Sequence, residues 1–416
     1  MSEKHSSSAG DRHGQIAVFA AADELAGLSD QLQRLRRSPL ALQAGGPAEA
    51  AAWCAANELP AVLLVDISAT AHPLPALLEL AALSGPACRI VALGNRQDVD
   101  LYRQLLRAGI FDYLLKPLPL DLLADTLARA EQDETLGSHG SARAGRTVAC
   151  VGAGGGVGTS TLVAALGRWL AESRQAPTVL VDFDRRKGDL PLLLGLEADA
   201  GLASVLAAPE IDPRLLQRTL LSQGEAETPR RLHLLAQRPG AETPLPPDRA
   251  LELGAALCQL FSLSLWDLPA HLPAGADEVL AHADTRLLLV EQSVQGARNA
   301  HRLLAELGDE SAGQRLLLIG SAAHLAERPA IERAQFEDFI GRAIDLQLPH
   351  AGASLAASLL QGPLQTRDAP AYARAVEQLG GLLLGQRPVA EAPAPGLLGR
   401  LRQWMGSTPR PATARP

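Results

Sequence analysis

The first third of the chain alternates short apolar runs with longer segments in which leucines recur at helical spacing. The apolar runs lie at Ile16–Ala20, Ala61–Ser68, Arg89–Gly94 and Phe111–Pro117. Helical spacing is clearest in residues 98–109 and 120–132. Short apolar strands that alternate with helices are typical of a parallel sheet covered by helices on both faces. We therefore predict an α/β domain over residues 15–132.

A second region with the same alternation begins after residue 146. Residues 133–146 are small, polar and rich in Gly and Ser, so we interpret them as a linker. Helical segments such as 160–174 and 296–308 then separate six further apolar runs, which predict a second α/β domain over 147–385. The six runs are residues 146–153, 177–184, 231–237, 260–270, 285–293 and 314–321.

The two ends of the chain have a different composition. Residues 1–14 are polar, without the apolar stretch of a signal peptide, and we expect them to be disordered. Residues 386–416 are rich in Pro, Ala and Arg, which favours disorder. Within them, residues 396–406 would place Leu397, Leu398, Leu401, Trp404 and Met405 near one helical face. Two interpretations stay open: a short helix that contacts a membrane surface or a partner, and a disordered tail with incidental apolar residues.

Composition narrows the class of protein. The net charge of -8 argues against a broad nucleic-acid footprint, and no nucleic-acid partner is expected. The four cysteines show no C-x-x-C spacing, which favours reduced thiols in a cytoplasmic protein. No run of about 18 apolar residues predicts a membrane-spanning helix. Of the 38 basic residues only Lys4, Lys116 and Lys187 are lysines.

A glycine-rich stretch joins the first apolar run of the second domain to the helix that follows. It reads Gly154, Gly155, Gly156, Val157, Gly158, Thr159, Ser160, Thr161. Glycines let backbone N–H groups approach phosphate, and the N-terminus of the helix attracts anions. The Ser160 or Thr161 hydroxyl suits Mg²⁺. We predict an ATP and Mg²⁺ site here; the alternative is a tight turn that binds no ligand.

The stretch resembles the deviant P-loop of the MinD/ParA group, K-G-G-x-G-K-[ST]. Gly154 stands where that pattern has its signature lysine, and Thr159 where it has the phosphate-binding lysine. Losing one charge-assisted hydrogen bond costs roughly 1.5–3 kcal/mol, about 10- to 100-fold in affinity. We therefore expect nucleotide binding to survive and hydrolysis to be slow or absent.

Acidic residues follow two of the apolar runs in the order of the same group. Asp182 and Asp184 in "VDFD" resemble its switch I aspartates, and Asp267 in "WDLPA" resembles its Walker B aspartate. The resemblance implies Mg²⁺ coordination by Ser160, Asp182 and Asp267, partly through water, and positioning of the attacking water by Asp184. Alternatively, these carboxylates are solvated or cap loops. Gly320-Ser321 replaces the usual Asn-Arg of the adenine site, and Pro349 is expected to wall the base.

The first domain resembles a response-regulator receiver. Asp66 lies at the phosphoacceptor position and Lys116-Pro117 at the conserved K-P. The acid pair after the first strand is missing, because Asp23 and Glu24 come too late in the chain, and Gly94 replaces the usual Thr/Ser. A carboxylate without an adjacent metal is poorly suited to phosphorylation, so we expect a vestigial receiver that serves as an interaction surface.

A receiver-like domain followed by a lysine-poor MinD-like domain resembles the TadZ/CpaE family over Ile16 to Gly385. Further resemblance lies in Gly201-Leu202, Leu206, Ile211-Asp212, Leu215 or Leu216, and Arg218. The family implies a flavodoxin-like receiver fold followed by a P-loop NTPase fold.

The same resemblance implies a cytoplasmic protein at the cell pole, peripheral to the inner membrane, that helps place the Tad machinery for Flp (type IVb) pili. A homodimer that works near the Tad secretion ATPase and the inner-membrane platform is expected. The alternatives are an active ParA/MinD-type positioning ATPase and, third, a phosphorylation-dependent response regulator.

Overall fold

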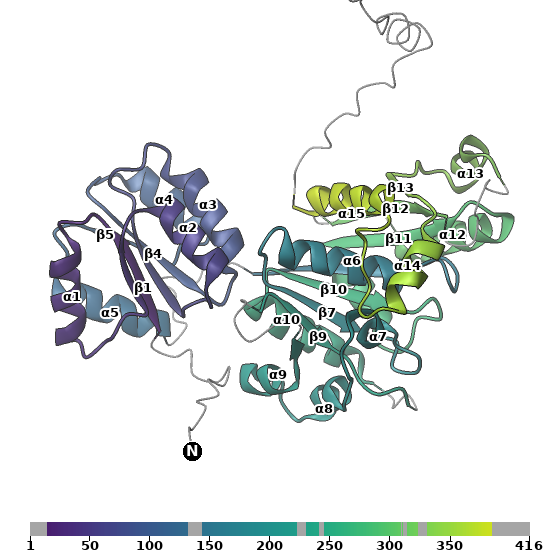
Figure 1. The fold of residues 1–416 in the computed structure, drawn as a ribbon, viewed down its shortest axis with the longest axis horizontal. Helices are drawn as coiled ribbons and strands as arrows, with labels where there is room; N and C mark the ends of the chain where they lie inside the picture. The colour runs from purple at the N-terminus through teal and green to yellow at the C-terminus, as the bar shows by residue number, and fades with distance from the viewer. Residues whose placement is uncertain are drawn as a thin grey trace, which may run out of the picture.

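The computed structural model describes two α/β units (Figure 1). The described residues are 15–131, 144–222, 230–240, 245–308, 310, 314–322 and 331–384. The N-terminal 14 residues, most of the expected linker and the tail with its apolar segment 396–406 lie outside them. Within the described residues, no helix is long and apolar enough to cross a membrane.

The first unit is a five-stranded parallel sheet in the order β2-β1-β3-β4-β5, the order of flavodoxin-like folds. Its strands are β1 (Ile16–Ala20), β2 (Ala41–Ala44), β3 (Val62–Asp66), β4 (Arg89–Gly94) and β5 (Asp112–Leu115). Its helices are α1 (Leu25–Arg34), α2 (Pro47–Ala56), α3 (Pro73–Ser84), α4 (Val99–Arg107) and α5 (Leu120–Glu131). The fold class predicted for this domain is confirmed.

Helices cover both faces of this first sheet. Alternate strand residues point to opposite faces, so Phe19 contributes to the core under α2, α3 and α4, and Val18 to the core under α1 and α5. All five residues of β1 and of β3 are buried, which explains their uninterrupted apolar sequence.

The second unit is an eight-stranded sheet in the order β13-β12-β11-β6-β10-β7-β9-β8, in which only the β8–β9 pairing is antiparallel. Its main strands are β6 (Arg146–Gly152), β7 (Thr178–Asp182), β9 (Leu232–Leu235), β10 (Leu263–Leu268), β11 (Thr285–Glu291) and β12 (Arg315–Ser321). All six correspond to predicted runs. The edge strands β8 (Leu221–Ser222) and β13 (Leu346–Leu348) were not predicted.

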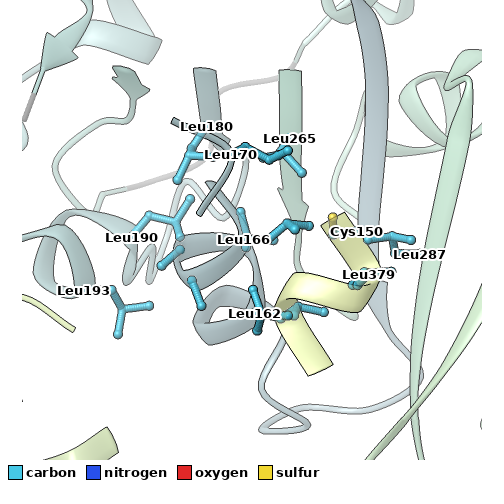
Figure 2. Close-up of a cluster of buried hydrophobic side chains, with 14 of the residues drawn as sticks. Cys150, Leu162, Leu166, Leu170, Leu180, Leu190, Leu193, Leu265, Leu287 and Leu379 are labelled. Atoms are coloured by element: carbon cyan, nitrogen blue, oxygen red, sulfur yellow. The ribbon is translucent and has the colours of Figure 1, made fainter. Parts of the chain in front are cut away.

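Helix α6 (Thr159–Glu172) packs between this sheet and α15 (Pro370–Leu383). Figure 2 shows its residues Leu162, Leu166 and Leu170 among side chains of the strands and of α15, including Leu265 and Leu379. Eight of the fourteen α6 residues are buried. This burial fixes the helix, and therefore its N-terminus, at the carboxyl ends of the central strands.

The opposite face of the second sheet is covered mainly by α10 (Pro247–Leu260), α11 (Ala276–His282), α12 (Val294–Leu307) and α13 (Arg333–Ile340). Trp266 of β10 is fully buried there against Phe183, with ring centroids 5.5 Å apart. The remaining helices are α7 (Leu190–Leu194), α8 (Gly201–Ala207), α9 (Pro213–Thr219) and α14 (Gly352–Leu359).

The two units touch through the amino-terminal edges of their sheets. The Arg231 guanidinium, just before β9, donates to the carbonyls of Cys54 and Asn57 at the C-terminus of α2, the latter at 3.1 Å. Gly85 at the end of α3 lies against Pro177, which precedes β7. Figure 1 shows α2 and α3 on the side of the first unit that faces the second.

Candidate nucleotide-binding site

The glycine-rich loop connects β6 to α6 at the carboxyl edge of the second sheet. Gly156 and Gly158 have φ angles of 76° and 90°, a region that favours glycine. A Cβ on Gly152 would lie 2.5 Å from Val157 Cγ2, so a side chain there would displace the loop. Backbone conformation therefore favours glycine at positions 156 and 158, and the lack of space for a side chain favours it at position 152.

The N-terminus of α6 has neither a side-chain cap nor an acidic residue in its first turn. Its N-cap is Gly158, which offers no side-chain cap, and the first turn contains no acidic residue. The first helical hydrogen bond runs from Leu162 N to Gly158 O, so the amides of Thr159, Ser160 and Thr161 precede it. A Cβ on Gly155 would meet nothing within 4 Å. Within the described residues, amides without an acceptor, the helix dipole and open space together suit an anion such as phosphate.

Two neighbouring strands hold the loop in place. Ala153 N donates to Leu289 O of β11 at 2.8 Å. The Ser321 hydroxyl, at the end of β12, donates to Val157 O at 2.7 Å. In the sequence, Gly320-Ser321 stood out only as a departure from the adenine site of the MinD/ParA group. In the structure, Ser321 holds the glycine loop through its hydrogen bond to Val157 O.

Asp182 and Asp267 lie side by side, because β7 and β10 pair with these two residues opposite each other. They are 2% and 4% exposed. Burial raises the pKa of Asp267 to about 7, with Asp184 and Asp189 adding to the shift and a hydrogen bond from Ser160 opposing it. Burial and the neighbouring Asp267 raise the pKa of Asp182 well above its usual value. The structure thus brings Ser160, Asp182 and Asp267 together.

The surroundings of Asp182 leave one of its oxygens unused. Oδ2 accepts from Leu190 N at 3.1 Å, whereas the buried Oδ1 has no hydrogen-bond partner in the described part of the chain. Gly188 packs directly on the carboxylate, since a Cβ there would lie 2.4 Å from Oδ2. Mg²⁺ takes one or two carboxylates together with hydroxyl, water and phosphate oxygens. The free Oδ1 of Asp182, beside a second carboxylate and the Ser160 hydroxyl, therefore suits Mg²⁺.

Asp184 is placed differently from its neighbour Asp182. It is half-buried, and its Oδ1 accepts from the backbone amides of Arg186 and Lys187 at 3.1 and 3.0 Å, which closes the turn after β7. Lys187 is exposed. The role of Asp184 in positioning a water stays a prediction.

Pro349 follows β13 at the same sheet edge as the loop. Its neighbour Leu348 pairs with Ser321, the residue that contacts Val157. His350 Nδ1 lies 2.8 Å from Ala322 O. Residues 323–330, which follow β12, lie outside the described residues. Contact between Pro349 and a base remains a prediction.

The receiver-like unit has an internal ion-pair network at its own carboxyl edge. Lys116 Nζ lies 3.0 Å from Asp66 Oδ2 and 2.7 Å from both carboxylate oxygens of Glu24. Burial alone would raise the pKa of Asp66, but hydrogen bonds from Ser68 and Lys116 outweigh it and lower that pKa. Glu24 stands at the N-cap position of α1, and its side chain reaches Lys116.

Tyr113 fills the place that the missing Thr/Ser leaves beside Gly94. A Cβ on Gly94 would lie 2.4 Å from the Tyr113 hydroxyl, which donates to Arg96 O at 2.9 Å. The Lys116 ammonium and this tyrosine lie at the carboxyl edge of the first sheet.

Comparison with known proteins gives partial matches. No family model matches the chain. One curated relative is the septum site-determining protein MinD of Helicobacter pylori, 31% identical over 157 residues, which are 38% of this chain. This chain thus spans 57% of the length of that relative.

Three solved structures illustrate the likeness. A ParA family ATPase from Chlorobium tepidum is 23% identical, with 57% of this chain and 98% of that chain covered and a TM-score of 0.48. MinD of Pyrococcus horikoshii, complexed with Mg-ADP, is 20% identical, with 57% and 95% covered and a TM-score of 0.48. A putative CpaE2 pilus assembly protein from Sinorhizobium meliloti is 26% identical, with 28% and 98% covered and a TM-score of 0.24.

The second domain places a glycine loop between β6 and α6 beside paired aspartates on β7 and β10, and part of the chain is similar in sequence to MinD. A flavodoxin-like domain precedes it in the same chain.

Proposed function

We propose that this chain is a Mg-nucleotide-binding localisation and scaffold protein with weak or no ATP hydrolysis. The observation that carries the proposal is the open N-terminus of α6 beside two buried carboxylates, one of which has an unpartnered oxygen. The loop amides would bind phosphate, and Ser160, Asp182 and Asp267 would hold Mg²⁺, in part through water. ATP is the expected ligand.

Slow hydrolysis follows from the side chains at two loop positions. Neither Gly154 nor Thr159 can place a positive charge on the transferring phosphoryl group, where charge stabilises the transition state. Binding would rely on backbone amides, the helix dipole and the metal, none of which depends on the missing lysines. A ligand that binds without rapid turnover stabilises one state of the protein in proportion to its concentration over Kd.

The biological setting rests on the sequence resemblance to the TadZ/CpaE family. We propose a cytoplasmic homodimer at the cell pole, peripheral to the inner membrane, that positions assembly of Tad/Flp (type IVb) pili. Its partners would be the Tad secretion ATPase and the inner-membrane platform proteins. The apolar segment 396–406 is a candidate for peripheral membrane contact.

An active ParA/MinD-type positioning ATPase is the second candidate. It is favoured by the retained carboxylates Asp182, Asp184 and Asp267. Steady-state phosphate release discriminates the two candidates: turnover comparable to that of lysine-containing members of the group would establish the ATPase and refute the slow-switch proposal.

Calorimetric titration of the full chain with Mg-ATP tests nucleotide binding. We expect a Kd in the micromolar range or tighter, weakened when EDTA removes Mg²⁺. Ser160→Ala should weaken binding in Mg²⁺, because it removes a metal ligand and the hydrogen bond to Asp267. Ser173→Ala, exposed at the other end of α6, is the matched control and should bind as the wild type does. No heat of binding up to millimolar Mg-ATP would refute the proposal.

A further inference from the structure

Asn299 of α12 places an amide beside the glycine loop. A Cβ built on Gly154 would have the Asn299 Nδ2 as its nearest neighbour, at 3.9 Å. Helix α12 packs on the sheet through Ala297, Ala300 and Leu303, so Asn299 lies off the buried face of the helix. The residue is half-buried.

The Asn299 side chain makes no hydrogen bond or ion pair within the described residues. A carboxamide can donate two hydrogen bonds and accept two, and leaving them unmade in a partly buried place is unfavourable. Neither α12 nor the glycine loop therefore uses the hydrogen-bonding groups of the Asn299 side chain. A ligand with acceptor oxygens, resting on the loop, would use the Nδ2 donors.

Gly154 is the position at which the chain lacks the signature lysine of the MinD/ParA pattern. We propose that Asn299 is a further nucleotide-binding residue, whose Nδ2 donates a hydrogen bond to the phosphate chain beside Gly154. The inference rests on the proposed nucleotide site. It implies that this chain contacts phosphate through a neutral donor from α12 at a place where the loop itself supplies no charge.

A neutral donor has a different consequence from a lysine. It orients a phosphate oxygen and contributes binding, but it does not neutralise the charge that develops during transfer. A site built in this way favours retention of the nucleotide over its hydrolysis, which agrees with the slow switch proposed above.

Substitutions at Asn299 test the proposal by titration with Mg²⁺ and a non-hydrolysable ATP analogue. Asn299→Ala should weaken binding roughly tenfold, because a hydrogen bond to a charged phosphate is lost. Asn299→Asp, of nearly the same size, should weaken it further through repulsion. Asn299→Gln, which keeps the donor, should restore part of the affinity. Thermal unfolding of the ligand-free variants should match the wild type, as a purely structural role would not allow.

The matched control is Ala305→Asp. Ala305 is exposed on the same helix, six residues after Asn299 and so about 9 Å from it along the helix axis. The substitution Ala305→Asp adds a negative charge, as Asn299→Asp does. It should change the Kd less than about twofold, because solvent screens exposed charges that lie near the Debye length apart. Wild-type affinity in Asn299→Ala and Asn299→Asp would overturn the role of Asn299 while leaving the nucleotide site standing. Absence of binding by the wild type would overturn both.

Discussion

Asp182 and Asp267 are two carboxylates that burial alone would keep protonated. Placing like charges on paired strands, away from water, is unfavourable unless a cation or a proton joins them. In the free protein at low pH, a proton would relieve the repulsion between the two carboxylates. In the nucleotide complex, Mg²⁺ would do so. Through this pair, the folding stability of the protein should depend both on pH and on ligand binding.

The first prediction concerns that linkage. A carboxyl with a raised folded pKa binds more protons in the folded than in the unfolded state, so its contribution to stability is lost as pH rises. We expect the ligand-free protein to lose a few kcal/mol, as an order of magnitude, from about pH 4 to about pH 7.

Thermal unfolding of wild type and Asp267→Asn across this range measures the effect. The amide cannot titrate, so the wild type should lose more stability than the variant between those limits. Parallel curves for the two proteins would show that Asp267 does not titrate there.

Single residues also mark the limit of the sequence analysis. The positions of the loop glycines and of Asp182 and Asp267 could be predicted, because they follow from local spacing along the chain. Gly188, Ser321 and Asn299 could not. Gly188 packs on Asp182 through the fold of a turn, and Ser321 and Asn299 approach the glycine loop from segments distant in the chain, as Ser321 does on Val157 across 164 positions.

At the scale of elements, strand length separates what was predicted from what was missed. The predicted strands are mostly four to seven residues of buried aliphatic sequence. The three missed strands have two to four residues, and the four residues of β2 include a single buried one, Ala41. A pattern that short has no period to detect. These short edge strands form by pairing with a neighbouring strand, whereas the central strands also have a recognisable apolar sequence of their own.

A second prediction concerns the network that joins α1, β3 and the end of β5 in the receiver-like unit. Lys116→Met leaves the carboxylates of Asp66 and Glu24 without their shared cation, and Asp66 is 7% exposed. We expect a loss of about 1–3 kcal/mol at neutral pH, below the range for fully buried pairs because Glu24 is partly solvated.

Chemical denaturation measures this change, and the double variant Lys116→Met with Asp66→Asn controls for it. Removing the buried charge together with its partner should restore part of the loss. A double variant no more stable than Lys116→Met would contradict the electrostatic explanation.

At the scale of the whole molecule, the two units share a small contact. The Arg231 guanidinium meets the C-terminus of α2, where carbonyl groups and the helix dipole favour a cation. The same residue's carbonyl accepts from Thr178 N at the start of β7, so the contact is continuous with the second sheet. Arg231 is 5% exposed.

The third prediction is that Arg231→Ala loosens this contact without unfolding either unit. Small-angle scattering should show a larger radius of gyration, and calorimetry should show two transitions moving apart. Arg230→Ala is the control, since the Arg230 side chain is exposed and, within the described residues, donates a hydrogen bond only to Ser222 of β8. Identical scattering from wild type and Arg231→Ala would mean that other contacts hold the units.

Because the units meet by the amino edges of their sheets, both carboxyl edges face outward, the Asp66 edge at one end and the glycine loop at the other. A chain that bound one partner at each of these edges would be bivalent. A surface that offered partners for both ends would retain it by avidity, far longer than either contact alone. Nucleotide would then alter the strength of only one of the two contacts, so its release would weaken attachment in a graded manner and leave the other end engaged.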